Sequence, residues 1–304
     1  MSIPEVSVVI PTRGRPESVG RAIRSALRQS FEDLEIIPVV DGPDAETASL
    51  LRTMDDERLR WIQLDCASGG SVARNAGVNA ARGKWIAFLD DDDEWLPEKI
   101  QKQVALAEAS SFAYPIVCSR LIARGPKADA IWPRKRPRSP LSEYLFCRSS
   151  VFQGEGLIQT SSLLTKRELM RMVPFQAGLR KHQDWDWLLR AATVDGTGIE
   201  FEPEPLLIWN TDRGTASVGS DQADNVSRDW LQANRALFTP RAYAGFLLTV
   251  VTPQVLQGAN KHRLFSIVWE AFAKGHPRAI DLLLFLGFCA IPKPVRYFLR
   301  SSFS

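Results

Sequence analysis

Four consecutive aspartates, Asp90 to Asp93, follow the apolar run Trp85 to Leu89 and have the clearest potential for chemistry in this chain. Adjacent carboxylates repel one another, and a divalent cation or a cationic ligand relieves that repulsion. Carboxylate oxygens are also ligands that Mg²⁺ and Mn²⁺ prefer. The run therefore predicts a cation site, with a solvated acidic turn as the simpler alternative. An EF-hand loop is excluded, because its spaced ligands and central glycine are missing.

The flanking residues place the four acids in a strand-to-helix loop. The apolar run before them predicts a strand, and Pro97 after them suits the first turn of a helix. In an open α/β sheet such loops lie at the carboxyl ends of the strands, where ligands bind.

Strand and helix patterns alternate through the first third of the chain. Apolar runs predict strands at 6–10, 34–40, 59–64, 84–89 and 116–122, and helical spacing predicts helices that begin at Pro16 and cover 45–54, 71–81 and 97–109. Such alternation predicts an α/β fold with a mostly parallel sheet and helices on both faces.

The alternation stops after residue 123. Residues 124–140 are basic and proline-rich, which predicts an exposed connection without a core; a solvated loop and a basic flap over an anionic substrate or membrane surface both fit. A strand at 157–165, a helical turn at 166–172 and short strands near 200–201 and 206–209 are expected next. The polar stretch 210–220 predicts a loop, whose Arg213 suits a phosphate.

A second acid with chemical potential lies at the start of a predicted helix. Trp187, Leu188 and Ala191 share one face at helical spacing, which leaves Asp184 near the N-terminus. The helix dipole favours a carboxylate there, so a capping role and a functional role both remain open. Asp186 fits a surface position.

Residues 221–304 predict a helical C-terminal extension after a first domain at 1–220. The apolar run Leu282 to Ile291 is far shorter than the ~20 residues that span a bilayer. Followed by Lys293, Arg296 and Arg300, it suits an interfacial membrane contact or a plain packing helix.

Composition narrows the class of protein. With 304 residues, 45% hydrophobic and 24% charged, the chain can bury a large core, and a net charge of +3 gives no argument for a nucleic-acid partner. The four cysteines are scattered without a CxxC pair, so neither zinc nor a disulfide framework is indicated. No signal-like segment opens the sequence, and a reduced, cytoplasmic setting is expected.

Four segments together resemble the family 2 glycosyltransferases in order and spacing. They are Val6 to Arg15, Glu35 to Ile37 leading to Asp41-Gly42, Ala73 to Gly77, and Phe88 to Asp93 with Trp95 and Pro97. Gln183-Asp184 with Trp187 and Arg190 extends the similarity. The resemblance implies a GT-A fold that moves a sugar, with inversion, from a nucleotide-diphospho-sugar to an acceptor hydroxyl.

The resemblance also implies roles for individual residues. Nucleotide-sugar contacts fall on Pro11, Thr12, Arg15, Asp41, Arg74, Asp90 and Asp91. The outer acids of the DxD motif match Asp90 and Asp92, with Asp92 as the better metal ligand for Mg²⁺ or Mn²⁺ and Asp90 nearer the ribose or a metal-bound water. Asp184 matches the general base.

Three positions depart from the family pattern. Gln183 replaces a glutamate, Val40 stands where many relatives carry an acid, and Arg213 stands where a histidine is frequent. The expected partners are the donor and a glycan or glycolipid acceptor, in cell-surface polysaccharide or glycolipid assembly at the inner face of the membrane. Two alternatives are a non-catalytic nucleotide-sugar binding protein and a sugar-nucleotide pyrophosphorylase, although the glycine-rich loop that would hold a triphosphate is missing.

Overall fold

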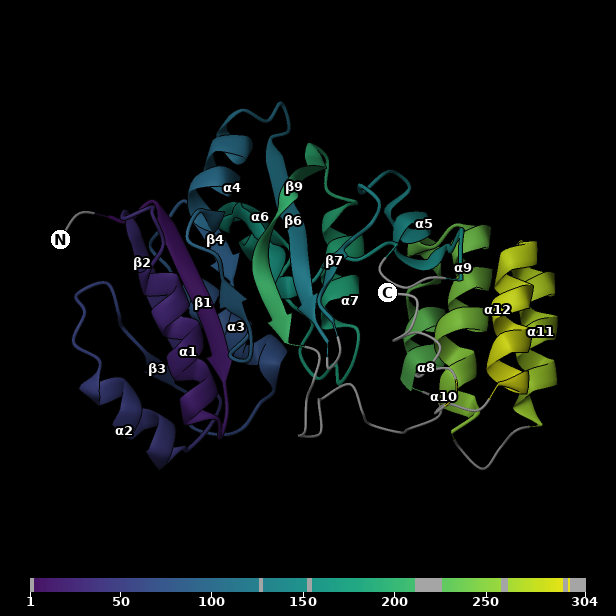
Figure 1. Cartoon of the computed structure of the whole chain (residues 1–304), viewed down its shortest axis with the longest axis horizontal. Coiled ribbons are helices and arrows are strands. Elements are labelled where there is room, and N and C mark those ends of the chain that lie inside the picture. Colours follow the sequence, from purple (N-terminus) through teal and green to yellow (C-terminus); the bar gives the residue numbers. More distant parts are fainter. Residues whose placement is uncertain are drawn as a thin grey trace. The chain divides into compact units, whose positions relative to one another are not determined.

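The computed structural model describes residues 3–125, 128–151, 155–210, 226–257, 262–291 and 295 (Figure 1). The chain forms two compact units that interleave along the sequence. Unit 1 contains residues 1–125, 158–179 and 183–212, and unit 2 contains 126–157, 180–182 and 213–304. The predicted division into domains 1–220 and 221–304 stays a prediction.

Unit 1 is built on a mixed, mostly parallel sheet. Its strands are β1 (Val6–Thr12), β2 (Leu34–Val40), β3 (Ile62–Gln63), β4 (Trp85–Phe88), β5 (Glu94–Trp95), β6 (Tyr114–Arg124), β8 (Leu164–Lys166) and β9 (Thr197–Asn210). Their order in the sheet is β3-β2-β1-β4-β8-β6-β9-β5. β8 runs antiparallel to β4 and β6, and β5 runs antiparallel to β9.

The register of the central strands brings their carboxyl ends to one edge. β1 lies between β2 and β4 and is parallel to both, with Val9 paired to Ile37 on one side and to Phe88 on the other. All three strands are almost entirely buried, which explains their continuous apolar sequence. The loops that follow these strands therefore begin at the same edge of the sheet.

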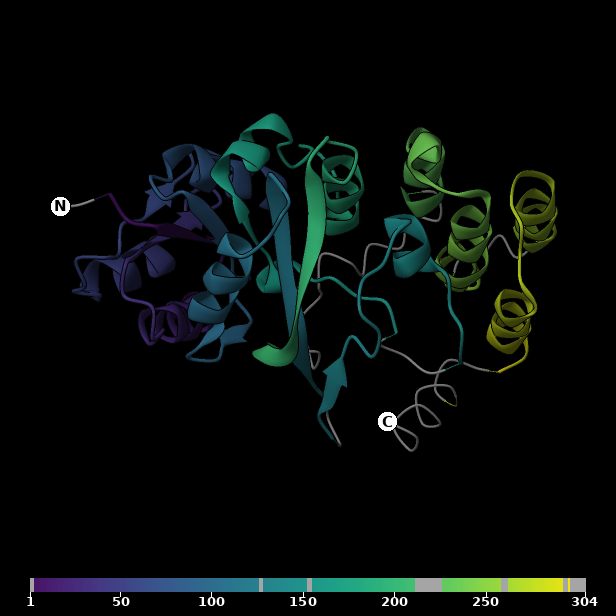
Figure 2. The same ribbon diagram turned by 90° about the horizontal axis from the view of Figure 1, so that it is seen from above.

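Helices cover both faces of this sheet (Figure 2). They are α1 (Pro16–Leu27), α2 (Ala45–Thr53), α3 (Gly70–Ala80), α4 (Lys99–Glu108), η1 (Thr160–Ser162), α6 (Arg167–Met172) and α7 (Gln183–Ala191). α3 packs closely on the sheet at Gly77, because a Cβ there would meet Val9 Cγ1 at 2.3 Å. The predicted α/β architecture, a mostly parallel sheet with helices on both faces, is confirmed.

Unit 2 is mainly helical. Its elements are β7 (Ala130–Trp132), α5 (Leu141–Phe146), α8 (Val226–Ala233), η3 (Arg235–Leu237), α9 (Pro240–Phe246), the π-helical η4 (Leu247–Val251), α10 (Thr252–Val255), α11 (Arg263–Lys274) and α12 (Ala279–Ala290). An aromatic cluster forms its core: Phe146 stacks on Phe238 at 5.1 Å between ring centroids, and Trp230 and Phe246 pack beside them.

Several predicted elements differ from those observed. The expected strand 157–165 is a 3₁₀ turn followed by β8. Residues 159–162 are polar and buried, and Gln159, Ser161 and Ser162 form side-chain hydrogen bonds there. The two short strands near 200 and 206 are one strand, β9, bent by register shifts against β6. The connection 124–140 contains the short strand β7.

Some predictions concern residues outside the described part of the chain. These are the loop 211–220 with Arg213, Lys127 of the basic connection, and Lys293, Arg296 and Arg300 of the tail. Among the described residues, no helix is long and apolar enough to cross a bilayer.

Candidate active site

Three loops of unit 1 converge at the carboxyl edge of the sheet. Thr12 ends β1, Asp41 follows β2, and Asp90 begins the loop after β4. The backbone N–H of Asp41 donates to Thr12 O at 2.9 Å, and the N–H of Leu89 donates to Val9 O at 3.1 Å, so the three chain segments leave the sheet side by side. The predicted site is therefore assembled by parallel pairing.

The four aspartates alternate between open and buried positions. The side chains of Asp90 and Asp92 are 22% and 16% exposed, whereas Asp91 and Asp93 are 2% and 1% exposed as whole residues. Two of the acids are thus accessible to a ligand, and the other two are buried. This alternation matches the DxD spacing, whose outer acids are Asp90 and Asp92.

Asp91 is a buried acceptor for the loop after β1. Thr12 Oγ1 donates to its Oδ2 at 2.7 Å, and Arg15 Nη2 lies 2.8 Å from its Oδ1. Arg15 also reaches Asp92 Oδ2 at 3.1 Å through Nη1. Burial is the main cause that raises the pKa of Asp91 to about 6, and the neighbouring acids Asp90 and Asp92 add to this shift. Arg15 and Thr12 oppose it.

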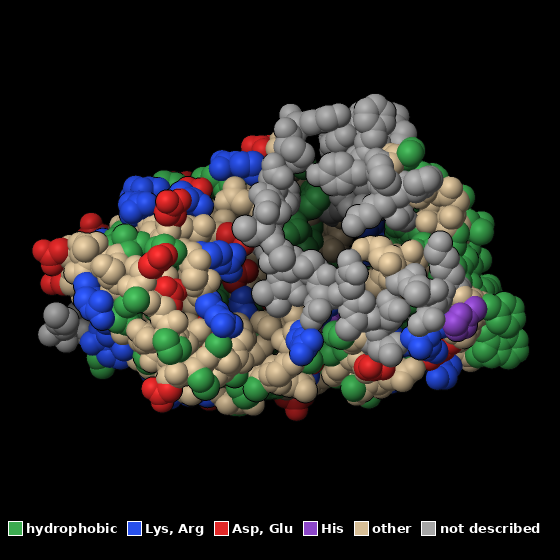
Figure 3. All heavy atoms as spheres, turned by 90° about the horizontal axis from the view of Figure 1, so that it is seen from below, with side chains coloured by type: hydrophobic (Ala, Val, Ile, Leu, Met, Phe, Trp, Pro, Cys, Tyr) green, Lys and Arg blue, Asp and Glu red, His purple; other side chains and the backbone are tan. Residues whose placement is uncertain are grey.

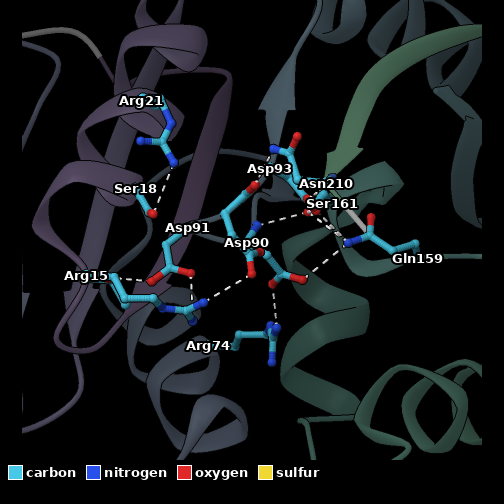
Figure 4. A network of polar contacts seen from close by, with 12 residues as sticks. Arg15, Ser18, Arg21, Arg74, Asp90, Asp91, Asp93, Gln159, Ser161 and Asn210 are labelled. Carbon is cyan, nitrogen blue, oxygen red and sulfur yellow. Dashed lines mark hydrogen bonds and ion pairs between the residues drawn. The ribbon is translucent and has the colours of Figure 1, made fainter. Parts of the chain in front are cut away.

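Asp93 ties the acidic loop to a segment that follows it by more than sixty residues. Its Oδ2 accepts hydrogen bonds from Gln159 Nε2 and Ser161 Oγ, both at 2.7 Å, and its Oδ1 accepts one from the N–H of Asn210 at 3.4 Å. Ser161 Oγ in turn accepts the N–H of Asp90 at 2.9 Å. These contacts orient the loop so that the carboxylate of Asp90 lies between Gln159 and Arg74 (Figure 4).

Arg74 joins the acidic loop to the start of α7. From α3, its Nη2 donates to Asp90 Oδ1 at 2.6 Å and its Nη1 donates to Gln183 Oε1 at 2.8 Å. The guanidinium lies over the ring of Phe175, 5.5 Å from its centroid, and is almost fully buried. A buried cation held by several partners in this way is a fixed source of positive charge.

Asp184 lies in the same site as the acidic loop. It occupies the first turn of α7, next to Gln183, and is partly buried. Burial raises the pKa of its carboxyl group, Arg74 opposes that shift, and Asp90 adds to it. Because Arg74 hydrogen-bonds both Asp90 and Gln183, the neighbour of Asp184, the start of α7 and the acidic loop lie in one region of unit 1.

Asp41 organises the loop before α3. Its two carboxylate oxygens accept the backbone N–H groups of Ser68 at 2.7 Å and Gly69 at 2.9 Å. Gly69 adopts φ 91, a conformation that favours glycine. Pro11 is half-buried within β1, paired to Val39. The nucleotide-binding roles of Asp41, Pro11, Thr12, Arg15 and the other matched residues stay predictions.

The accessible carboxylates fit a hard divalent cation that also binds substrate phosphates. Among the described residues, no group of three or more His, Cys, Asp or Glu side chains is arranged as a complete metal site. Mg²⁺ and Mn²⁺ sites of phosphate-handling enzymes need only one or two carboxylates, since the phosphates and water supply the remaining oxygens. Asp90 and Asp92 meet that requirement.

Sequence reasoning did not identify Gln159, Ser161 and Asn210 as site residues. The available signal was the unbroken polar run Gln159 to Ser162 inside a segment expected to be a strand.

A cavity of about 550 Å³ elsewhere in unit 1 shares no residue with this site. It is lined by Lys84, Lys166, Arg167, Glu168, Arg171 and Met172.

The fold matches that of a solved glycosyltransferase structure. The structure of mannosyltransferase PcManGT from Pyrobaculum calidifontis, determined with GDP-Man and Mn²⁺, superimposes with a TM-score of 0.61 at 18% identity and covers 99% of this chain and 85% of that one. The architecture is therefore that of a GT-A glycosyltransferase.

Sequence comparison identifies the family. The model of glycosyl transferase family 2 matches residues 7–180. The succinoglycan biosynthesis protein ExoO of Rhizobium meliloti is 38% identical over 279 residues, which cover 90% of this chain and 78% of that protein. The amylovoran biosynthesis glycosyltransferase AmsB of Erwinia amylovora is 27% identical over 261 residues, with coverage of 78% and 82%. The chain belongs to glycosyl transferase family 2 and is a glycosyltransferase.

Proposed function

We propose that this glycosyltransferase uses Asp184 as general base and Asp90 and Asp92 to hold a divalent cation with the donor diphosphate. The supporting observation is the network in which Arg74 bonds Asp90 and Gln183 and interacts electrostatically with Asp184. Two acids that are more than ninety residues apart in sequence thereby face one small region. A transfer reaction needs such proximity between the leaving group and the incoming hydroxyl.

The acidic loop binds the donor. Asp92 is the principal ligand of Mg²⁺ or Mn²⁺, and Asp90, held by Arg74 and by Ser161 through its backbone, supports the ion or the ribose. When bound, the cation neutralises the charge that develops on the departing nucleoside diphosphate. Arg15, now paired with Asp91 and Asp92, is a cation placed at the same loop and suits the diphosphate.

Asp184 activates the acceptor. Its carboxylate removes the proton of the acceptor hydroxyl as that oxygen attacks the anomeric carbon, which inverts the configuration there. Burial raises the pKa of the Asp184 carboxyl group, which makes its carboxylate a stronger base, and Arg74 opposes that shift. General base catalysis of this kind contributes about 10²- to 10⁴-fold in rate.

The acceptor is a glycan or glycolipid of cell-surface polysaccharide assembly. The relatives ExoO and AmsB are named for the biosynthesis of succinoglycan and amylovoran. We place the reaction on the cytoplasmic side, at the inner face of the membrane, with a peripheral membrane contact through the C-terminal region.

Donor binding and transfer test this proposal together. A thermal-shift screen of UDP-, GDP- and dTDP-sugars should give stabilisation by one nucleotide class that increases with Mn²⁺. The selected donor should then be hydrolysed slowly in the presence of the ion and consumed faster with a membrane glycolipid extract. Stabilisation by a donor without any turnover in either assay would show a binding protein instead.

A further inference from the structure

Helices α11 and α12 of unit 2 expose a surface of aromatic and leucine side chains. On α11, Phe265 and Trp269 are 80% and 68% exposed and Phe272 is more than half exposed. Their spacing places them on one stripe of the helix. The opposite face of α11 carries Ile267 and Ala271, which are buried in unit 2. The aromatic stripe therefore does not belong to the core of this unit.

α12 extends the surface. It is almost entirely apolar, with Asp281 as its single charged residue, and Asp281 is also its single fully buried residue. Leu283 and Leu286, one turn apart, are more than half exposed. Figure 3 shows hydrophobic side chains gathered at the right of the view, the side on which Figure 1 places α11 and α12. A helix that is apolar on all sides normally lies in a core or in lipid.

Among the described residues of α11, α12 and their connection, the charged side chains that are not buried are all basic. They are Arg263, Lys274 and Arg278, and the two acids there, Glu270 and Asp281, are buried. Both acids point inward. Glu270 accepts a hydrogen bond from Tyr243 at 2.6 Å and pairs with Arg228 and with Lys274, whose Nζ lies 3.1 Å from its Oε1. Asp281 accepts the N–H of Arg278 at 2.9 Å as part of a capping box.

We propose that the exposed faces of α11 and α12 bind the anionic surface of a phospholipid bilayer. Phe265, Trp269 and Phe272, with the leucines of α12, enter the interface, where aromatic side chains are favoured. The basic residues attract the lipid phosphates. At 12 residues α12 is about 18 Å long, so it lies in the interface and does not span the membrane.

The positive charge of this surface argues against a second copy of the chain as its binding partner. A two-fold contact through this surface would bring Arg263, Lys274 and Arg278 toward the same residues of the other copy. Like charges at an interface are unfavourable, whereas an anionic bilayer complements them. This surface of unit 2 makes the membrane contact proposed above, and its binding to lipid does not depend on sugar transfer.

Flotation with vesicles tests the proposal on the full chain. The protein should float with phosphatidylcholine vesicles that contain phosphatidylglycerol, float weakly with phosphatidylcholine alone, and lose part of the difference at high salt. The triple variant Phe265→Ser/Trp269→Ser/Phe272→Ser should bind about 100-fold more weakly, because each change removes apolar area that lipid would bury.

The control variant is Ile131→Ser/Val151→Ser, which removes two other exposed apolar side chains of unit 2 and should leave flotation unchanged. Unchanged circular dichroism and donor hydrolysis without vesicles would show that the triple variant folds and that its defect is separate from catalysis. Equal flotation of the triple variant and the wild type would overturn the proposal. So would a stable dimer that the triple variant converts to a monomer, because the surface would then be a contact between copies.

Discussion

The alternation of the four aspartates predicts opposite consequences for two neighbouring substitutions. Asp93→Asn should destabilise unit 1, whereas Asp92→Asn should leave stability nearly unchanged and remove metal-dependent donor binding. The difference follows from burial: the carboxylate of Asp93 accepts bonds from Gln159, Ser161 and Asn210, and that of Asp92 is partly exposed beside Arg15.

The contacts set the size of each effect. Hydrogen bonds to a charged group contribute about 1.5–3 kcal/mol each. An asparagine at 93 keeps one acceptor oxygen and turns an amide N–H₂ toward a donor, so we expect a loss of about 2–3 kcal/mol. For a chain of this size that corresponds to a melting temperature lower by ~4–12 °C. The Arg15–Asp92 pair is open to solvent on the arginine side and contributes about 0–1 kcal/mol.

Urea unfolding of the metal-free protein and calorimetry of the donor with Mn²⁺ would measure both quantities. Asp93→Asn should shift the unfolding midpoint and retain donor binding at low temperature. Asp92→Asn should unfold like the wild type and bind the donor poorly. The reasoning is refuted if Asp92→Asn is the more destabilised variant, or if Asp93→Asn loses metal-dependent binding at unchanged stability.

Three further substitutions test other parts of the structure. Arg74→Lys keeps the positive charge but cannot donate to both Gln183 and Asp90. Because a charge-assisted hydrogen bond contributes about 1.5–3 kcal/mol, kcat/KM should fall about 10- to 100-fold. An unchanged kcat/KM would contradict this role. Burial, assisted by Lys181, lowers the pKa of His182 to about 3, so the native imidazole stays neutral while the unfolded one is protonated below about pH 6.5. The free energy of unfolding should therefore decrease as pH falls from 6.5 toward 3, less so in His182→Phe, and equal pH slopes in urea titrations would refute this. Burial lowers the pKa of Lys99 well below its usual range. Lys99→Met should therefore raise the melting temperature at neutral pH, and the difference from the wild type should shrink toward pH 10.5. A melting temperature below that of the wild type would contradict this prediction.

Regular local patterns predicted the central elements of the fold. β2 covers Leu34–Val40 as expected, and α1 begins at Pro16, because a continuous apolar run and a proline at the first helical turn are properties of the segment itself. The acidic loop was predicted at the edge of the sheet for the same reason. The third strand was predicted too long: only Ile62 and Gln63 pair with β2 as a strand, with Leu59 in an isolated bridge to Ile36.

The distant partners of the acidic loop were not predictable in this way. Gln159 and Ser161 reach Asp93 and Asp90 only because β8 inserts antiparallel between β4 and β6, a pairing without a local sequence signal. The distinction between open and buried aspartates depends on those same contacts. The resemblance to the family predicted Asp90 and Asp92 as the outer acids, and the fold adds that Asp91 and Asp93 are buried. The role of Asp184 was predicted from the resemblance to the family. The structure adds that Arg74 hydrogen-bonds both its neighbour Gln183 and Asp90 of the acidic loop.

The most direct test of the central claim is the transfer activity of Asp184→Asn. The amide has the size of the carboxylate but cannot accept the acceptor's proton, and the residues placed on the donor are untouched. Calorimetry should show donor binding with Mn²⁺ close to that of the wild type, while single-turnover transfer to the acceptor falls by about 10²- to 10⁴-fold. Full transfer activity in this variant would contradict the assignment of the base and, with it, the proposed mechanism.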